Sequence, residues 1–214
     1  VRNNLTVLLQ AAAMTVLLAV VSMPIATAVG LATALGRQYG PRPLAWALSV
    51  YVEVLRGTPL MLQLYVIFFT LPEIGIALPA MAAAILGLAV NYSAYEAEIY
   101  RAGLNAVPRG QMEAALSLGM SRSQAIRRII APQAVRLVIP PITNDFIALF
   151  KDTSVCSVVT VVELTKQYNV LAQNTGAILQ LATVTALLYL LMSYPLSLAT
   201  RWSENRLGVG LQHH

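Results

Sequence analysis

The sequence predicts an all-α polytopic membrane protein with about five transmembrane helices, the N-terminus outside the cell and the C-terminus inside. Of its 214 residues, 57% are hydrophobic and only 11% are charged, whereas soluble domains carry roughly 25% charged residues. The mean hydropathy is +0.68, and residues 3–36 contain no charged side chain. These observations argue against a water-soluble globule and predict one membrane domain over residues 1–214.

The excess of basic residues is a second indication of a membrane protein. A net charge of +5 could point to nucleic acid. In so apolar a chain, however, excess arginine is more typical of the cytoplasmic ends of membrane helices. We therefore expect a lipid bilayer and no nucleic acid as partner. The single cysteine, Cys156, excludes an intramolecular disulfide and a cysteine metal site, and no metal site is expected.

The first predicted span, residues 5–36, is longer than the roughly 20 residues that a bilayer requires. The excess indicates a tilted helix or a few interfacial residues, and Pro24 is expected to kink the span. A short turn carrying Arg37 and Arg42 follows. Because basic residues concentrate on cytoplasmic loops, we place this turn inside the cell.

The second predicted span, residues 44–71, is divided by the Gly-Thr-Pro sequence at 57–59. Before this break, Ser49, Glu53 and Arg56 recur at i, i+4 and i+7, which puts them on one face of a helix. We expect Glu53 and Arg56 to form a structural ion pair near the cytosolic interface.

The third predicted span, residues 79–103, has a small, apolar outer half and an inner half dense in polar side chains. At helical spacing, Asn91, Tyr95 and Glu98 share one face, and Glu98 can reach Arg101 at i+3. Such polar groups within a membrane usually line a cavity or pair with one another.

The fourth predicted span, residues 136–163, contains Lys151 and Asp152 in its interior. A helix that starts near residue 136 rises roughly 22 Å by Lys151, which leaves the charge within a hydrocarbon layer roughly 30 Å thick. The fifth predicted span, residues 174–201, is free of charge until its last residue. With the first basic turn inside, five spans leave few basic residues outside, as the positive-inside rule requires.

A polar, arginine-rich loop at residues 104–135 separates the third and fourth spans. It contains Glu-Ala-Ala at 113–115, then Gly119 after three residues and Ile129 after nine more, with Pro132 close behind. This spacing resembles the EAA signature of the membrane subunits of ABC importers, except that a leucine of the signature is replaced by alanine at position 131. Longer stretches, at 51–64, 94–115 and 132–154, resemble the polar amino acid uptake branch of the histidine/glutamine/arginine permease type.

The resemblance implies a type I ABC importer fold whose loop forms short cytosolic helices that dock on a separate ATPase. The residues themselves favour such helices, since Gly119 permits a sharp turn and Ser121 is a plausible N-cap for the helix that follows. The expected coupling residues are Glu113, Ala114, Ala115, Gly119, Ser121, Arg122, Ile129 and Pro132. A solvated basic loop without a partner is the alternative.

The resemblance also implies the partners and the location. Expected partners are two ABC ATPase subunits, a second permease copy or a paralogue, an extracytoplasmic substrate-binding protein and a polar amino acid. The expected location is the bacterial cytoplasmic (inner) membrane.

The chain contains no motif for binding nucleotide. A P-loop ends in Lys-Ser or Lys-Thr after a Gly-rich turn, whereas the two lysines, Lys151 and Lys166, are followed by Asp152 and Gln167. We therefore expect no enzymatic activity and no cofactor on this chain, with ATP and Mg on the partner ATPase.

An amino acid zwitterion needs a cationic group or a helix N-terminus for its carboxylate and an anionic or carbonyl group for its ammonium. The candidate pathway residues are Asn91, Tyr92, Tyr95, Glu98, Lys151, Asp152, Thr153, Ser154 and Glu163. Two alternatives stay open, namely that Glu98 with Arg101 is a structural pair and that Lys151 with Asp152 lies at the outer interface. Asn144 and Asp145 are expected to satisfy backbone groups that the two preceding prolines free.

The predicted function is the permease subunit of an ATP-driven, binding-protein-dependent importer of polar amino acids. The alternative is an ion- or proton-coupled secondary transporter using Lys151, Asp152 and Glu163, against which the absence of an internal repeat argues. A membrane scaffold without transport activity does not explain the charges within the spans. The sequence leaves open which amino acid is carried and whether the permease pairs with itself or with a paralogue.

Overall fold

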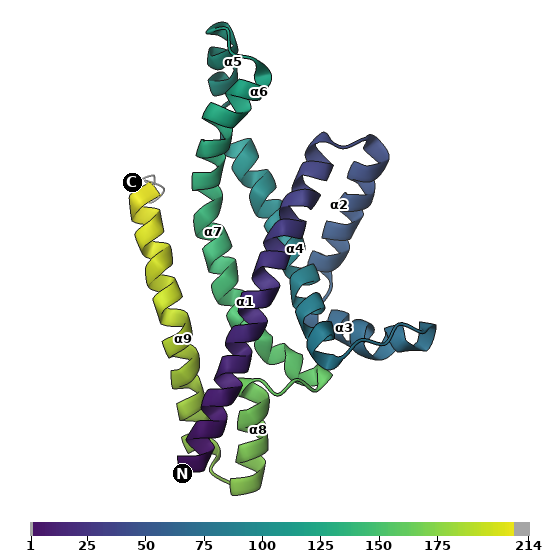
Figure 1. The fold of residues 1–214 in the computed structure, drawn as a ribbon, viewed down its shortest axis with the longest axis vertical. Helices are drawn as coiled ribbons and strands as arrows, with labels where there is room; N and C mark the ends of the chain where they lie inside the picture. Colours follow the sequence, from purple (N-terminus) through teal and green to yellow (C-terminus); the bar gives the residue numbers. More distant parts are fainter. Residues whose placement is uncertain (1, 208–214) are drawn as a thin grey trace.

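The computed structural model describes residues 2–207, and every regular element within that range is a helix (Figure 1). The last seven residues of the predicted domain lie outside the described part. The first helix, α1 (Arg2–Tyr39), runs the length of the bundle and contains Pro24. It crosses α4 closely at Gly30, where an added Cβ would lie 2.5 Å from Cβ of Glu96 and 2.9 Å from the Ser93 carbonyl oxygen. Only glycine allows this approach.

The second predicted span is broken, as the Gly-Thr-Pro sequence indicates. Helix α2 (Arg42–Gly57) ends at the break, and α3 (Leu60–Tyr65) leaves it at 108° with the π-helical η1 (Val66–Thr70) and the 3-10 segment η2 (Leu71–Ile74). Pro59 fixes an extended φ of −64° and cannot donate a backbone hydrogen bond. The short turn that follows has Gly75 in the left-handed region, at φ 85°.

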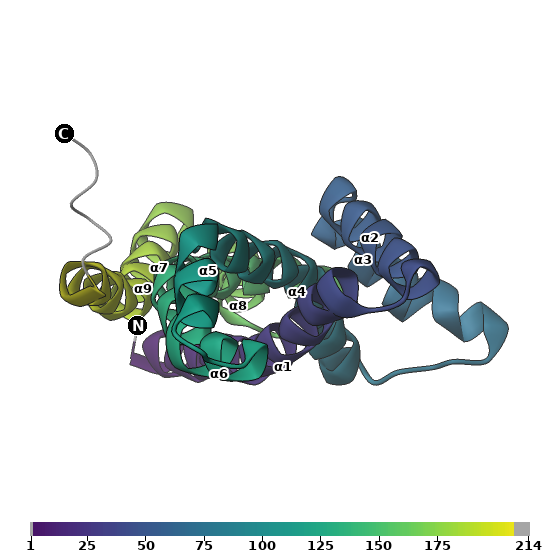
Figure 2. The same cartoon turned by 90° about the horizontal axis from the view of Figure 1, so that it is seen from above.

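Helix α4 (Ala80–Ala106) lies at the centre and contacts α1, α2 and α7. Seen along the bundle, α2 and α3 lie on one side and α9 on the other (Figure 2). On α4, small buried residues such as Ala84, Ala94 and Ala97 form the faces that contact neighbouring helices. Such small side chains let the backbones of neighbouring helices approach closely.

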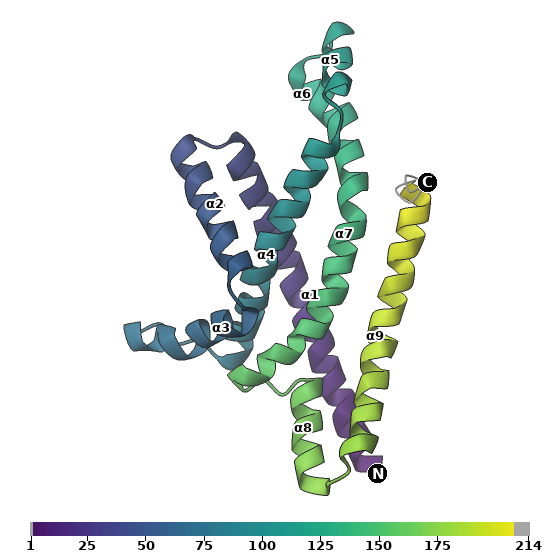
Figure 3. The ribbon, with the colours of Figure 1, turned by 180° about the vertical axis from the view of Figure 1, so that it is seen from behind.

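The loop between α4 and α7 forms α5 (Arg109–Ser117), α6 (Arg122–Ala125) and the π-helical η3 (Ile126–Ile130), which protrude at one end of the molecule (Figures 1 and 3). Helix α7 (Ala131–Asp152) continues directly from η3. It therefore begins before the predicted residue 136, because Pro132 occupies the first turn, where its missing N–H is tolerated.

The end of the fourth predicted span is also not a continuous helix. After α7, the chain forms the 3-10 segment η4 (Thr153–Val159), then α8 (Leu164–Thr175) and α9 (Ile178–Leu207). Cys156 is fully buried with Leu64 and Leu88 in one hydrophobic cluster, so it packs the core. Helix α7 therefore ends at Asp152, within the fourth predicted span, and the 3-10 segment begins at Thr153.

Two stretches, Asn4–Tyr39 and Ile178–Trp202, are helical, long and apolar enough to cross a membrane, and the bent pair Arg42–Gly57 with Leu60–Ile74 would make a third. Helices α4 and α7 have 27 and 22 residues, which at 1.5 Å per residue also reaches across a hydrocarbon layer of roughly 30 Å. The count of five spans and the orientation stay predictions.

Candidate functional site

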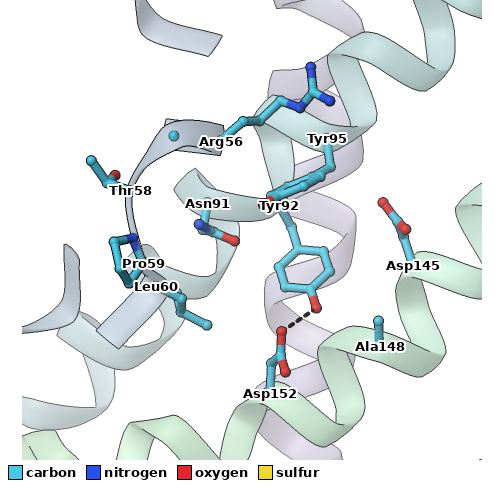
Figure 4. A pocket seen from close by; sticks show the side chains of 11 residues that line it. Arg56, Thr58, Pro59, Leu60, Asn91, Tyr92, Tyr95, Asp145, Ala148 and Asp152 are labelled. Carbon is cyan, nitrogen blue, oxygen red and sulfur yellow. Dashed lines mark hydrogen bonds between the residues drawn. The ribbon is translucent and has the colours of Figure 1, made fainter. Parts of the chain in front are cut away.

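A polar cavity of about 540 Å³ opens beside the break between α2 and α3 (Figure 4). That volume lies within the roughly 300–1,000 Å³ of small-molecule sites. Side chains from the end of α2, the start of α3, the middle of α4 and the last turns of α7 surround it. The lining residues are Arg56, Gly57, Thr58, Pro59, Leu60, Asn91, Tyr92, Tyr95, Asp145, Ala148 and Asp152.

Gln63 holds the wall of this cavity together. Its side-chain amide donates to the carbonyl oxygens of Leu55 (2.9 Å) and Thr58 (3.2 Å) and to the Thr58 hydroxyl (2.9 Å). Its Oε1 accepts from Asn91 Nδ2 at 3.1 Å. The break frees backbone carbonyls that lack helical partners, and one glutamine satisfies two of them while linking α2, α3 and α4.

Tyr92 and Asp152 connect α4 to the end of α7. The Tyr92 hydroxyl donates a 2.8 Å hydrogen bond to Asp152 Oδ2 (Figure 4). Asp145, two turns earlier on α7, also lines the cavity. The α7 side of the cavity therefore presents two carboxyl groups.

The opposite side presents a cation, Arg56, at the end of α2 (Figure 4). Its guanidinium lies 5.7 Å from the centre of the Tyr95 ring, a cation–π geometry. Its nearest carboxylate is Glu98, with 4.0 Å between Arg56 Nη1 and Glu98 Oε2. The cavity thus has positive and negative groups on separate walls.

Glu98 is the centre of an ion cluster outside the cavity. Arg37 of α1 and Arg101 of α4 both pair with it, with Arg101 Nε 3.1 Å from Glu98 Oε2. Arg37 also donates to the Ser49 hydroxyl at 3.2 Å. The cluster ties α1, α2 and α4 together, and the predicted contact between Glu98 and Arg101 is confirmed.

The predicted ion pair between Glu53 and Arg56 is wrong. Glu53 is exposed and takes part in no ion pair within the described residues. Both residues lie on α2, but the carboxylate nearest to Arg56 is Glu98 of α4. Spacing along one helix cannot reveal a partner that tertiary packing supplies.

The structure brings only part of the predicted substrate pathway together. Four of the predicted residues line the cavity: Asn91, Tyr92, Tyr95 and Asp152. Asp145 lines it too, although the sequence predicts that Asp145 binds backbone groups freed by the two prolines. The break itself also forms a wall of the site, since Gly57, Thr58 and Pro59 line the cavity. Five predicted residues do not line it: Glu98, Lys151, Thr153, Ser154 and Glu163.

Glu163 instead caps α8. Its side chain is fully buried and accepts from the backbone N–H groups of Thr165 and Lys166, both at 2.7 Å. Tyr189 of α9 donates to it at 3.1 Å. These bonds occupy the carboxylate, so Glu163 joins α8 to α9 and is not available to a substrate in the cavity.

The predicted coupling loop forms a compact helical tip. Ala115 of α5 and Ala125 of α6 are buried, and α5 contacts both α6 and η3. Ala115 therefore allows helices within the tip to approach closely, whereas Glu113 and Ala114 are exposed and face outwards. Exposed residues of the tip also include Arg122 and Pro132, while Ile129 is half-buried.

Two local predictions for this tip are confirmed. Gly119 has φ +80°, a left-handed conformation that side chains disfavour. Ser121 caps α6 through a capping box: its hydroxyl accepts from Gln124 N at 3.3 Å, and Gln124 Oε1 accepts from Ser121 N at 2.9 Å.

Leu118, next to this turn, was not singled out from the sequence. Its side chain is 82% exposed, the largest exposed fraction among the exposed large hydrophobic residues. A single exposed hydrophobic side chain is common on protein surfaces and does not by itself mark an interface. In the sequence, only its position between Ala115 and Gly119, within the predicted coupling loop, drew attention to Leu118.

Comparison with known proteins identifies the family. Residues 26–209 match the family described as binding-protein-dependent transport system inner membrane component. The chain is 40% identical to the L-cystine transport system permease protein of Bacillus subtilis, over 90% of this chain and 83% of that protein. It is 33% identical to the glutamine transport system permease protein of Escherichia coli, over 94% and 93% of the two chains.

Solved structures agree with this assignment. An amino acid ABC transporter crystallised with histidines superposes with a TM-score of 0.89 at 36% identity, covering 94% of each chain. The fold of an inward-facing methionine ABC transporter also matches, with a TM-score of 0.69 at 20% identity and 95% of each chain covered. The resemblance drawn from the EAA spacing is confirmed, and the chain belongs to the family of inner-membrane components of binding-protein-dependent transport systems.

Proposed function

We propose that this chain is the permease subunit of an ATP-driven importer of polar amino acids and that its polar cavity is part of the translocation pathway. The observation that carries the proposal is the separation of charge within that cavity. Arg56 lies on the α2 wall, and Asp145 and Asp152 lie on the α7 wall. Relatives named for cystine and glutamine transport support the choice of substrate class.

The cavity suits the two charged groups of an amino acid zwitterion. A guanidinium binds a carboxylate through charge-assisted hydrogen bonds, and Arg56 is free to do so because its contact with Glu98 is long, at 4.0 Å. An ammonium group would bind Asp145 or Asp152. The hydrogen bond from Tyr92 holds Asp152 in place before a substrate arrives.

The helical tip is the second part of the proposal. We infer that α5 and α6 dock on a separate ABC ATPase, with Leu118, Glu113 and Arg122 in the contact. Two ATPase subunits, which bind ATP and Mg, and a second permease subunit would complete the transporter. An extracytoplasmic binding protein would deliver the amino acid. ATP-driven movement of the tip would reach the cavity through η3 and α7, because α6, η3 and α7 follow one another without a break.

Adjacent residues on α7 provide a test of the pathway. Asp152 lines the cavity, whereas Lys151 is exposed and does not. Asp152→Asn should weaken equilibrium binding of the preferred amino acid to the purified transporter by about tenfold, the value of one hydrogen bond to a charged group. Lys151→Gln should leave binding unchanged.

The binding measurement uses radiolabelled cystine, glutamine and histidine in the absence of the binding protein, since the binding protein would otherwise set the apparent affinity. Arg56→Gln should weaken binding of every amino acid in the panel because all share the carboxylate. Equal binding by wild type, Asp152→Asn and Arg56→Gln would remove the cavity from the pathway.

A further inference from the structure

A second cavity, of about 700 Å³, lies between α1, α4 and α7 and is almost entirely apolar. On α4 it is bordered by Tyr100 and Leu104, whereas the polar cavity is bordered by Asn91, Tyr92 and Tyr95. At 3.6 residues per turn these two sets lie on opposite faces of α4. The apolar cavity is therefore a separate feature, turned away from the proposed pathway.

This cavity is a groove along the helix axes. Leu31, Leu35 and Tyr39 border it at i, i+4 and i+8 on α1, and Val135 and Ile139 border it at i and i+4 on α7. Residues four apart lie above one another on one helix face. The groove thus runs in the direction in which α1 and α7 cross the membrane, which is the direction of lipid acyl chains.

The rim of the groove is open to the surroundings of the chain. Leu31 and Leu35 are each 42% exposed and Val135 is 52% exposed. The groove is lined by no charged side chain, and its only side-chain polar groups are the hydroxyls of Tyr39 and Tyr100. A polar small molecule would lack the convergent polar anchors that such sites provide, whereas a hydrocarbon chain needs none.

One end of the groove is basic. Ile126 lines it at the start of η3, and the next two residues are Arg127 and Arg128, both exposed. On α1, Tyr39 lines the same end, and Arg42 follows at the start of α2. Within residues 4–202, none of these three arginines forms an ion pair. They can therefore bind an external anion beside an apolar slot.

We propose that this groove binds an anionic phospholipid, with one acyl chain between α1 and α7 and the phosphate at Arg127 and Arg128. The apolar length and the basic end match the two parts of such a lipid, and clusters of basic residues beside membrane helices attract anionic head groups. An apolar helix of a second copy would have no use for the basic end. The inference needs only the membrane location and is independent of the substrate pathway.

Native mass spectrometry of the full-length protein, extracted from membranes in a mild detergent, tests the proposal. After incubation with equal amounts of phosphatidylglycerol and phosphatidylethanolamine, the wild type should retain phosphatidylglycerol with a preference on the order of tenfold, given two arginines at the head group. The double variant Arg127→Gln, Arg128→Gln should still retain lipid but without that preference.

A matched pair of valines tests the position of the acyl chain. Val135 borders the groove, and Val50 is a similarly exposed valine on α2 that borders neither cavity. Val135→Trp should reduce lipid retention at least severalfold, because the indole fills the slot, and Val50→Trp should not. Wild-type protein without bound phospholipid would overturn the proposal, as would equal retention by the two tryptophan variants. Cross-linking of Val135→Cys to a second copy of the chain would overturn it as well.

Discussion

The side-chain amide of Asn91 donates a hydrogen bond to Gln63 Oε1, 3.1 Å away, and so joins the centre of α4 to the helix that leaves the break at 108°. Gln63 in turn binds the carbonyl oxygens of Leu55 and Thr58. A sharp break within a membrane is tolerated only where the freed backbone groups find partners inside the protein. Gln63 supplies these partners, and the polar cavity depends on it.

The first prediction follows from this role. Gln63→Leu should lower the free energy of unfolding by about 2 kcal/mol or more, since each buried polar group left without a partner costs about 1–3 kcal/mol. Reversible unfolding in mixed micelles with increasing SDS measures the change. Gln133→Leu is the control, because Gln133 makes one local bond, to Ile129 O within the adjoining helical turn, and should change stability by less than about 1 kcal/mol.

Replacement of two glutamates on α4, Glu96 and Glu98, should change the free energy of unfolding in opposite directions. Glu96 is fully buried, and neither of its carboxylate oxygens has a hydrogen-bond partner among the described residues. Glu98 is paired with Arg37 and Arg101. Glu96→Leu should therefore raise the free energy of unfolding by about 1–3 kcal/mol, and Glu98→Gln should lower it by about 2–3 kcal/mol. The same SDS titration measures both, and a loss of stability in Glu96→Leu would show that this carboxyl has a partner in the assembled protein.

Two glycines in the helical tip distinguish a conformational need for glycine from a steric one. An added Cβ would meet no atom within 4 Å at either Gly110 or Gly119, but only Gly119 has a positive φ. Gly119→Ala should strain the turn by about 1 kcal/mol, whereas Gly110→Ala, within α5, should be neutral or slightly stabilising. The measured quantity is the affinity of the purified ATPase subunit for the chain in nanodiscs. Weaker binding is expected for Gly119→Ala only, and equal binding by both variants would count against the tip as the docking element.

Replacement of Glu163 should lower the stability of the protein and leave substrate binding unchanged. Glu163→Ala removes the cap of α8 and leaves the Tyr189 hydroxyl without this acceptor. The expected loss is about 1–2 kcal/mol of stability, with amino acid binding to the folded protein unchanged. Glu53→Ala, at an exposed glutamate on α2, is the control for both readouts. Selective loss of substrate binding in Glu163→Ala would return this residue to the pathway.

Features governed by local chemistry could be predicted from the sequence. The break at 57–59 follows from a glycine and a proline in an apolar helix, and the turn at Gly119 and the cap at Ser121 follow from the conformations that these residues favour. The contact between Glu98 and Arg101 lies within one helical turn. In each case the determining residues are a few positions apart in the chain.

Features that depend on packing between helices could not be predicted in this way. The carboxylate near Arg56 comes from another helix, and Asp145 reaches the cavity because α7 lies beside α4 at that height. Glu163 resembles a buried charge awaiting a ligand in the sequence, but α8 begins directly after it and takes up its oxygens. Register between helices, and the exact residue at which each helix starts, decided these outcomes.

The most direct test of the central claim is uptake by proteoliposomes that contain the complete transporter, with its ATPase subunits inside and loaded binding protein added. We predict that the amino acid accumulates only when ATP is hydrolysed and that accumulation persists when ionophores collapse every ion gradient. Accumulation that follows an imposed ion gradient and proceeds without ATP would contradict the account.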